Sequence, residues 1–238
     1  MTAPLYLYDD ARARTFEPFA LTRPASELRA GAEIVRRRWE RALGARAAGF
    51  VGAPHLAHFE EFDAPGAAHG LLPAGAVVAN SRCTPRLVTV ADADCSVWRC
   101  EGRVAAVRLA QATTVAHLAD GSVALEQLAP KTGAREGTIE GWWTDEVWDH
   151  LRQLNAQLAD DLPLLASTLV CEPPPAHTTV LGAHAVHLER GATIEPFVVL
   201  DATAGPILVR RAAVVQSFTR LSGPAYVGEG TTIVGDRV

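Results

Sequence analysis

The fold of the C-terminal part of this chain is decided by residues 198–238, which read VVLDATAGPILVRRAAVVQSFTRLSGPAYVGEGTTIVGDRV. Aliphatic residues recur there at every sixth position, in a rhythm that begins at Leu188 and slips once by three residues. A six-residue period fits neither an amphipathic helix nor an alternating strand, and it is typical of a parallel β-helix built from hexapeptides. The aliphatic positions are Leu188, Ile194, Leu200, Val209, Val215, Leu221, Val227 and Ile233.

A second column of small or branched residues lies four positions after the aliphatic ones. In a solenoid each turn contacts only its neighbours, so we expect the aliphatic residue to point inward and the small residue to fit a corner. The slip, at ATAGPIL (202–208), predicts a loop at one corner. Arg237 breaks the column and no capping helix follows, so we expect either a piece of a longer protein, which we favour, or a natural short form that covers its open end by assembly. The second column is Ala192, Val198, Ala204, Ala213, Thr219, Ala225 and Thr231.

The N-terminal region alternates apolar runs with helical patterns. LYLY (5–8), AGFVG (48–52) and GAVVAN (75–80) predict buried strands, and Glu101-Gly102 predicts a hairpin turn. Together with two predicted helices, this alternation indicates an α/β sheet. Ligands bind beyond the carboxyl ends of the strands in such sheets. Asp9, Asp10 and Asn80 follow or end predicted strands, and are therefore candidate site residues.

The two predicted helices cover ELRAGAEIVRRRWERALG (27–44) and TDEVWDHLRQLNAQLADDL (144–162). In the first, we expect a buried face of Val35, Trp39 and Ala42, solvated Arg36, Arg37 and Arg38, and a stop at Gly44. In the second, Thr144 is the predicted N-cap, and Trp148, Leu151, Asn155 and Leu158 share one predicted buried stripe. A buried amide needs partners, so Asn155 is expected to make either a structural hydrogen bond or a ligand contact.

Composition narrows the function classes. The net charge of −5 provides no basic field for nucleic acid. No apolar run approaches the roughly 18 residues of a membrane helix, and MTAPLYLYDDARAR lacks a signal-peptide pattern. The four cysteines form no C-x-x-C pair, so neither a zinc site nor a redox dithiol is expected. We expect a cytoplasmic protein with reduced thiols, and neither nucleic acid nor membrane as a partner.

Several motifs resemble those of a known family. They are LYDD (7–10), which overlaps the end of the first predicted strand, LTRPASELRAG (21–31), RRRWE (36–40) and NSR (80–82). A further pattern places Trp148, Asn155 and Asp160 in order. With the hexapeptides, they resemble a divergent bacterial group of alternative bifunctional UDP-N-acetylglucosamine diphosphorylase / glucosamine-1-phosphate N-acetyltransferases. The resemblance implies a Rossmann-like nucleotidyltransferase-type α/β domain over 1–170, a Pro-rich linker over 171–185, and a left-handed β-helix over 186–238, incomplete in this sequence. The better-known nucleotidyltransferases open with a Gly-rich loop, whereas no glycine precedes Gly31 here.

The resemblance implies transfer of UMP from UTP to N-acetylglucosamine-1-phosphate with Mg²⁺. Such a reaction needs arginine or lysine on the phosphates and carboxylates for the metal. Arg23 and Arg29 are the predicted catalytic phosphate ligands, with a solvated surface role as the alternative. Asp9 and Asp10 are the predicted metal ligands, or else cap a loop through Asx turns. The predicted substrate-binding residues are Asn80, Arg82, Asn155 and Arg14.

Two other functions stay open at this point. The missing Gly-rich loop favours a degenerate module that binds a sugar nucleotide or a partner without catalysis. The hexapeptides favour an acetyltransferase that uses acetyl-CoA, which the family layout supports only for a longer β-helix. The family's catalytic histidine lies beyond this sequence, so we assign no role to His184 or His187. The resemblance also implies a homo-oligomer, a trimer formed through the β-helix.

Overall fold

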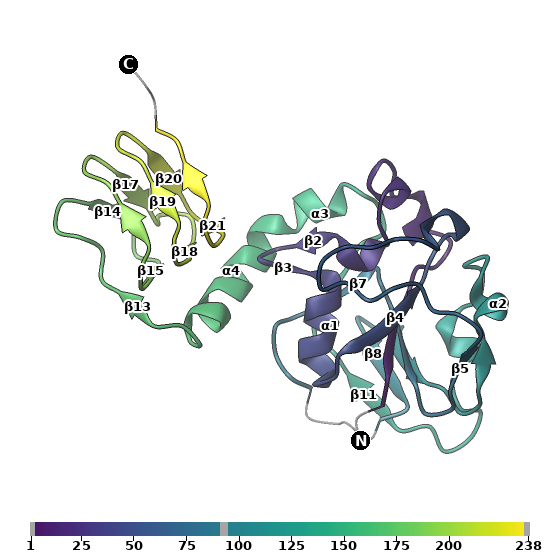
Figure 1. Cartoon of the computed structure of the whole chain (residues 1–238). Helices are drawn as coiled ribbons and strands as arrows, with labels where there is room; N and C mark the ends of the chain where they lie inside the picture. Colours follow the sequence, from purple (N-terminus) through teal and green to yellow (C-terminus); the bar gives the residue numbers. More distant parts are fainter. Residues whose placement is uncertain (1–2, 91–94, 236–238) are drawn as a thin grey trace. The chain divides into compact units, whose positions relative to one another are not determined.

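The computed structural model describes residues 3–90 and 95–235, and forms two compact units, Met1–Gln153 and Leu154–Val238 (Figure 1). In the described part of the chain, no helix is long and apolar enough to cross a membrane. Cys83, Cys95 and Cys100 are buried, Cys171 is exposed, and all four are free thiols, as expected. The domain bounds drawn from the sequence, at residues 170 and 185, stay predictions.

A six-stranded mixed sheet organises the first unit, in the order β11-β8-β9-β6-β1-β4. Strand β1, next to the edge strand β4, runs parallel to both β4 and β6, whereas β9 runs antiparallel to β6 and β8. The predicted strands and the hairpin turn at Glu101-Gly102 are confirmed. The strands are β1 (Leu5–Tyr8), β4 (Ala47–Val51), β6 (Val77–Asn80), β8 (Val97–Cys100), β9 (Arg103–Arg108) and β11 (Glu136–Thr138).

Alternation along β1 explains why the sheet is covered on both faces. Leu5 and Leu7 join one buried cluster, which includes Trp39 of α1 (Val35–Leu43). Tyr8 joins a second cluster, which includes Leu118 of α2 (Val115–Leu118). Successive side chains of a strand point to opposite faces, so one apolar strand fills both cores.

The predicted helix over 27–44 starts later than expected. Its buried face is confirmed, since Val35, Trp39 and Ala42 are at most 1% exposed. Gly44 ends it with φ 61°, a left-handed conformation that glycine adopts without strain. Upstream of Val35, however, the chain forms a hairpin of β2 (Arg29–Ala30) and β3 (Glu33–Ile34). The Pro24 ring, which has no N–H, and the left-handed Gly31 (φ 61°) favour this turn over helix.

The prediction of three solvated arginines on α1 is wrong for two of them. Arg36 is 3% exposed and Arg38 is fully buried. Arg36 donates to Glu27 Oε1 at 2.6 Å, and Arg38 donates to the carbonyls of Ala30 and Pro85. A buried cation persists where hydrogen-bonded acceptors surround it, and here the acceptors come from the hairpin (Ala30), the turn before it (Glu27) and a distant strand (Pro85).

The predicted helix over 144–162 is broken in two, α3 (Asp149–Arg152) and α4 (Leu154–Ala166). Thr144 is buried and precedes both, so its predicted N-cap role is wrong. The predicted buried stripe is wrong for three of its four residues, because Trp148 is 48% exposed, Leu151 is 76% exposed and Asn155 is exposed, whereas Leu158 is buried as predicted. At the break, Gln153 Nε2 donates to the Trp143 carbonyl at 2.8 Å.

Short elements complete the first unit. The two remaining strand pairs are β10 (Thr113–Thr114) with β5 (Leu71–Leu72), and β12 (Gly141–Trp143) with β7 (Cys83–Pro85). The 3₁₀ turns are η1 (Ala13–Thr15), η2 (Phe19–Leu21), η3 (Ala25–Glu27), η4 (Pro54–Leu56) and η5 (Leu125–Gln127).

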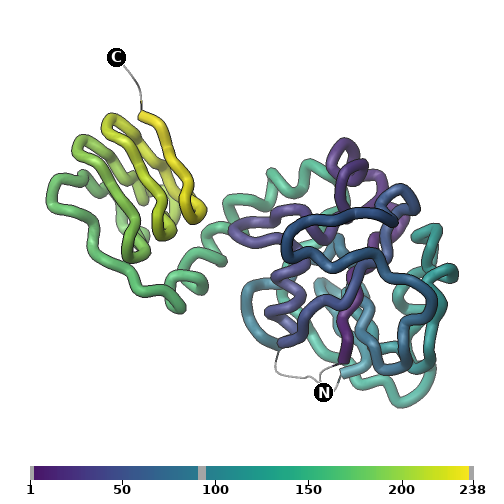
Figure 2. The backbone as a smooth tube through the Cα atoms, viewed as in Figure 1, coloured from purple at the N-terminus to yellow at the C-terminus, as the bar shows by residue number. Residues whose placement is uncertain are grey.

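The second unit stacks its strands in three parallel sets, which Figure 2 shows as successive turns of the chain. The predicted interior column is confirmed: Leu188 pairs with Val209, and Val209 with Val227, all inside one apolar cluster. This arrangement is compatible with the predicted β-helix. The sets are β14 (Thr179–Leu181), β17 (Val199–Asp201), β20 (Arg220–Ser222); β15 (Val186–Glu189), β18 (Ile207–Val209), β21 (Ala225–Val227); and β16 (Thr193–Ile194), β19 (Val214–Val215), β22 (Thr232–Ile233), with β13 (Cys171–Glu172) antiparallel to β15.

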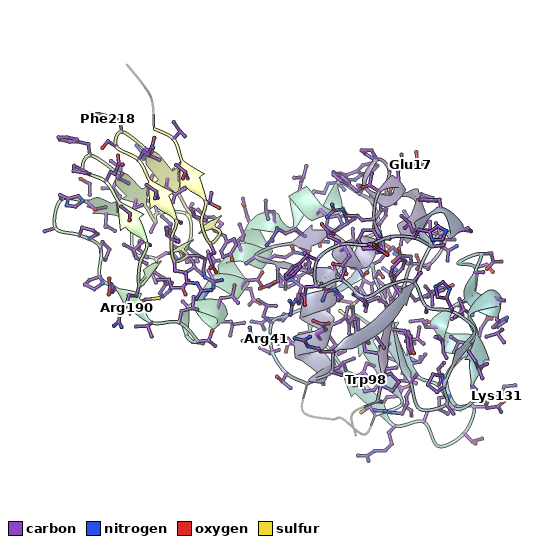
Figure 3. All side chains as sticks on the ribbon, in the orientation of Figure 1. Glu17, Arg41, Trp98, Lys131, Arg190 and Phe218 are labelled. Carbon is purple, nitrogen blue, oxygen red and sulfur yellow. The ribbon has the colours of Figure 1, made fainter. Side chains whose placement is uncertain are left out.

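The three-residue slip falls in the loop between β17 and β18, as predicted. Two glycines from successive turns meet there: a methyl group on Gly223 would lie 2.2 Å from the Gly205 carbonyl oxygen. At another corner, Phe197 and Phe218 stack with ring centroids 5.3 Å apart, and Phe218 points outward (Figure 3). Arg237, where the small-residue column breaks, lies outside the described residues.

We predict that Gly223→Ala destabilises the second unit by about 2 kcal/mol, because the added methyl group overpacks the corner. Urea unfolding followed by far-UV circular dichroism measures the change. Gly228→Ala is the matched control, since its methyl group would meet Thr231 Oγ1 at an ordinary 3.5 Å. Equal stabilities of the two variants would contradict the close packing of Gly205 and Gly223.

Candidate functional site

The carboxyl ends of β4, β1 and β6 meet at one edge of the sheet, and β1 lies between the other two. The chain leaves β1 toward β4 and leaves β6 toward β9 on the opposite side. This reversal makes the gap between β1 and β6 a topological switch point, where open α/β sheets bind ligands. Asp9 and Asp10 directly follow β1, and Asn80 ends β6, so three predicted site residues lie at this edge.

Asp10, Asn80 and Arg82 form one hydrogen-bonded group. Asp10 Oδ2 accepts from Asn80 Nδ2 at 2.8 Å and from Arg82 Nη2 at 2.7 Å. Asp10 Oδ1 accepts from Arg82 Nε at 2.8 Å and from the Ala13 amide at 2.9 Å. Burial acts to raise the pKa of Asp10, but the hydrogen bonds and charge of Arg82, with Asn80 and Ala13, outweigh it and lower the pKa.

The group extends to residues that the sequence analysis missed. Arg82 Nη1 donates to Asp145 Oδ1 at 2.6 Å, and Arg103 Nη1 donates to Asp145 Oδ2 at 2.9 Å. Both guanidinium groups lie over the Trp143 ring, with Arg103 at 3.9 Å and Arg82 at 5.4 Å from its centroid. No motif marks Arg103, Trp143 and Asp145, which come from two segments outside the NSR motif of Arg82. The adjacent WW pair and the arginine after the hairpin turn were the only signals in the sequence.

A cavity of about 310 Å³ opens over this group. We call it the switch-point cavity, and its charged and aromatic lining consists of Asp10, Arg12, Arg82, Arg103, Glu126 and Trp143. Arg12 is bound to the Asp145 carbonyl and the Glu146 carboxylate.

Arg14, a predicted substrate ligand, donates its side-chain hydrogen bonds to backbone carbonyls. It donates to the carbonyls of Asp9 at 2.9 Å and Ala119 at 2.5 Å, and more weakly to that of Leu118. The loop after α2 is thereby held against the loop after β1. Gly121 allows this approach, because a methyl group there would lie 2.7 Å from the Ala11 nitrogen.

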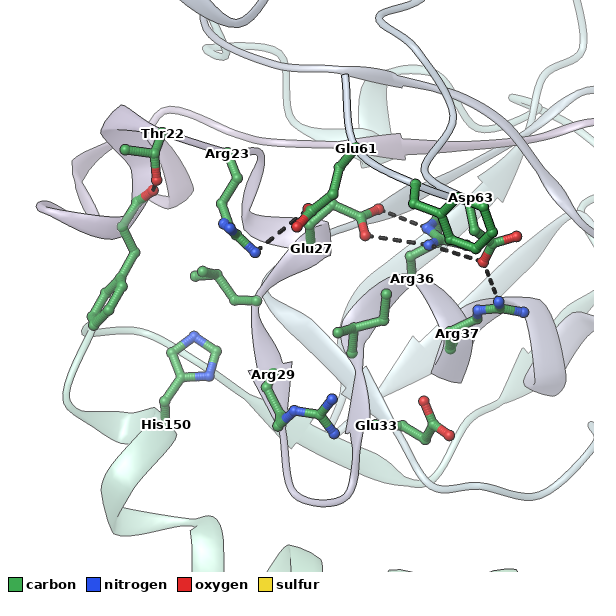
Figure 4. Close-up of a pocket in the computed structure, with 14 residues that line it drawn as sticks. Thr22, Arg23, Glu27, Arg29, Glu33, Arg36, Arg37, Glu61, Asp63 and His150 are labelled. Carbon is green, nitrogen blue, oxygen red and sulfur yellow. Dashed lines mark hydrogen bonds and ion pairs between the residues drawn. The ribbon is translucent and has the colours of Figure 1, made fainter. Parts of the chain in front are cut away.

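Arg23 and Arg29 lie in a second, larger cavity of about 970 Å³, which we call the Arg23 cavity (Figure 4). It lies between the segment after β1 and the loop that follows β4. Arg23 Nη1 lies 3.5 Å from Glu61 Oε2, with both side chains about two-fifths exposed. Arg29 Nη1 donates to the Ala32 carbonyl at 2.5 Å. His150 faces the same cavity, and burial lowers its pKa.

Asp9 connects the strand end to the wall of the Arg23 cavity. It is 2% exposed, and its Oδ2 accepts from the Ala25 amide at 3.0 Å, next to the Thr22-Arg23-Pro24 segment. Burial raises the pKa of Asp9 to about 6, although Ser81, the Ala25 amide and Arg14 act in the opposite direction.

The predicted metal ligands do not fit a Mg²⁺ centre of the protein's own. Asp9 is enclosed, and both oxygens of Asp10 already accept two hydrogen bonds or more. Mg²⁺ demands several oxygen ligands in octahedral geometry. Within residues 3–90 and 95–235, no three His, Cys, Asp or Glu side chains gather to hold a metal ion. Asn155 is exposed on α4, in the second unit, and is not part of either cavity lining.

Comparison with known protein families identifies a match over the first unit. A family model described as "Sugar nucleotidyl transferase" matches residues 5–169, more than half of the chain. The matched span includes the whole six-stranded sheet and both cavities. No curated protein matches the chain significantly.

We predict that Asp9→Asn removes a pH dependence of stability. Folding raises the pKa of Asp9 from 3.8 to about 6, so the folded state binds the proton more tightly and the wild type loses stability as the pH rises through this range. At 1.36 kcal/mol per pKa unit, the difference in unfolding free energy between variant and wild type shifts by about 2 kcal/mol in favour of the variant between pH 4 and pH 7, because pH 4 already lies just above the unfolded-state pKa of 3.8.

Urea unfolding at several pH values measures this shift. Glu60→Gln, at an exposed carboxylate, is the control for simple charge removal. A difference between Asp9→Asn and the wild type that is the same at pH 4 and pH 7 would show that Asp9 does not carry the raised pKa.

Proposed function

The chain belongs to the sugar nucleotidyl transferase family, and we propose that it transfers UMP from UTP to N-acetylglucosamine-1-phosphate. The observation that carries this proposal is the pair of arginine-lined cavities beside β1, at the carboxyl ends of parallel strands. The reaction brings two anionic substrates together, so it needs two neighbouring places for phosphate.

Cavity size supports the assignment of each substrate. The Arg23 cavity, at about 970 Å³, has room for a nucleoside triphosphate, whereas the switch-point cavity, at about 310 Å³, suits a sugar phosphate. The half-exposed pair of Arg23 with Glu61 contributes little to stability. A phosphate group can therefore replace Glu61 as the partner of Arg23, and Arg29 lines the same cavity.

In the proposed reaction, a phosphate oxygen of the sugar-1-phosphate attacks the α-phosphorus of UTP. The new P–O bond forms as the bond to pyrophosphate breaks, and pyrophosphate leaves with its electron pair. Arg23 and Arg29 hold the triphosphate and neutralise charge that develops on it, while Arg82 and Asn80 position the acceptor. The dependence on Mg²⁺ stays a prediction, and no step here uses Asp9 or Asp10 as a metal ligand.

Arg14 and Asn155, the other predicted substrate-binding residues, are not assigned a substrate contact in this reaction. Arg14 acts by positioning the loop after β1 through backbone carbonyls. A ligand role for Asn155 stays a prediction.

For the second unit, we propose a left-handed β-helix that assembles as a trimer. The three stacked parallel strand sets and the six-residue column support the β-helix.

A second candidate function is a module that binds a sugar nucleotide without turnover. Two observations favour it: no glycine precedes Gly31 in the segment after β1, and Asp10 is already saturated with donors. Nucleotide binding with normal affinity, but with no pyrophosphate release under any metal condition, would select this function over catalysis.

We predict that Arg23→Gln lowers the rate of pyrophosphate release from UTP and N-acetylglucosamine-1-phosphate by at least about tenfold, because a charge-assisted contact to phosphate is lost. A coupled pyrophosphate assay with a panel of nucleotides, sugar-1-phosphates and divalent metals measures it. Arg46→Gln, at an exposed arginine outside both cavities, is the control. Full activity of Arg23→Gln would place the triphosphate elsewhere.

A further inference from the structure

Three arginines from separate segments converge on the switch-point cavity. Arg12 comes from the loop after β1, Arg82 from the residues after β6, and Arg103 from the start of β9. All three donate to the same residue: Arg82 and Arg103 to the Asp145 carboxylate, and Arg12 to the Asp145 carbonyl. Two positive charges thus share the Asp145 carboxylate, and Arg12, which is paired with Glu146, lies beside them.

The arginines are fixed before any ligand arrives. Arg82 is 7% exposed, with Asp10 on one side and the Trp143 ring against its guanidinium. Arg103 lies flat on the same ring, at 3.9 Å from the centroid. Preorganised guanidinium groups bind tetrahedral oxyanions well, because their N–H donors match two oxygens at once.

Asp145 is far more accessible than Arg82, the buried member of this group. Its side chain is 46% exposed, against 9% for that of Arg82, and it lies in the turn before α3 rather than in the sheet. Its two oxygens accept from Arg82 and Arg103, as two oxygens of a phosphate group would. A half-exposed carboxylate is held weakly by such pairs, so an incoming dianion can displace it.

We propose that the switch-point cavity is a metal-independent site for the phosphate of a phosphorylated sugar, in which Asp145 occupies the arginines until the ligand replaces it. Arg103 and Arg12 grip the phosphate, and Arg82 supplies a fixed buried charge in the place that a divalent cation was predicted to take. Glu126, in the same lining, offers a carboxylate acceptor for sugar hydroxyls. The sugar-phosphate identity rests on the proposed function, whereas the anion site rests on the arginines alone.

Isothermal titration calorimetry of the full chain with N-acetylglucosamine-1-phosphate, in EDTA, tests the proposal. We expect binding without metal, at least tenfold weaker binding by Arg103→Gln, and about tenfold tighter binding by Asp145→Asn, since its competing charge is removed. Arg99→Gln is the matched control: Arg99 lies on the same hairpin and makes an equivalent pair with Glu136, outside the cavity. Because Arg82 is buried and its variants are at risk of misfolding, the test uses Arg103.

Inorganic phosphate and UTP are the comparison ligands. Weaker binding of inorganic phosphate that shows the same dependence on Arg103 supports the anion site, and tighter binding of the sugar phosphate supports its identity. Binding that needs Mg²⁺, or that is unchanged in both Arg103→Gln and Asp145→Asn, overturns the proposal. UTP turnover and the effect of Arg23→Gln are separate measurements, so metal-free sugar-phosphate binding without turnover would sink the proposed function and leave this site standing.

Discussion

The first unit depends on one buried charge, the guanidinium of Arg82. It joins the end of β1, through Asp10, to the turn before α3, through Asp145, while the Arg82 backbone amide donates to Asn80 Oδ1 at the end of β6. A charge removed from water is tolerated only where it is paired and hydrogen-bonded. The elements that supply its partners are therefore held in one arrangement, and the switch-point cavity forms around them.

Buried charged side chains also hold the segment between β1 and α1, where a glycine-rich loop is missing. Asp9 holds the Ala25 amide, Asp10 holds the Ala13 amide, and the buried Arg38 holds the Ala30 carbonyl. Side chains thus bind backbone groups that regular secondary structure leaves unpaired. Buried carboxylates and arginines, rather than flexible glycines, hold the backbone segments that surround both cavities.

Local pattern was sufficient for some features and not for others. The strands at 5–8, 48–52 and 75–80 were predictable because continuous apolar runs must be buried whatever surrounds them. The start of α1 was not, because helical periodicity extends through residues 27–34 while Gly31 and the acceptors for Arg36 and Arg38 favour a hairpin. The break at Gln153 was missed because residues 144–162 contain no proline or glycine to mark it.

By itself, the sequence determined the stacked strands of the second unit, since a six-residue repeat buries the same column in every turn and needs no distant partner. It also placed Asp9, Asp10 and Asn80 at one edge, because parallel strands end together. Only the tertiary structure decided that Asp10 faces an arginine instead of an open metal position, and that Arg12, Arg82 and Arg103 converge on Asp145. These residues are far apart along the chain, and the pairing of charges across such distances is set by the packing of strands and loops, which no local pattern encodes.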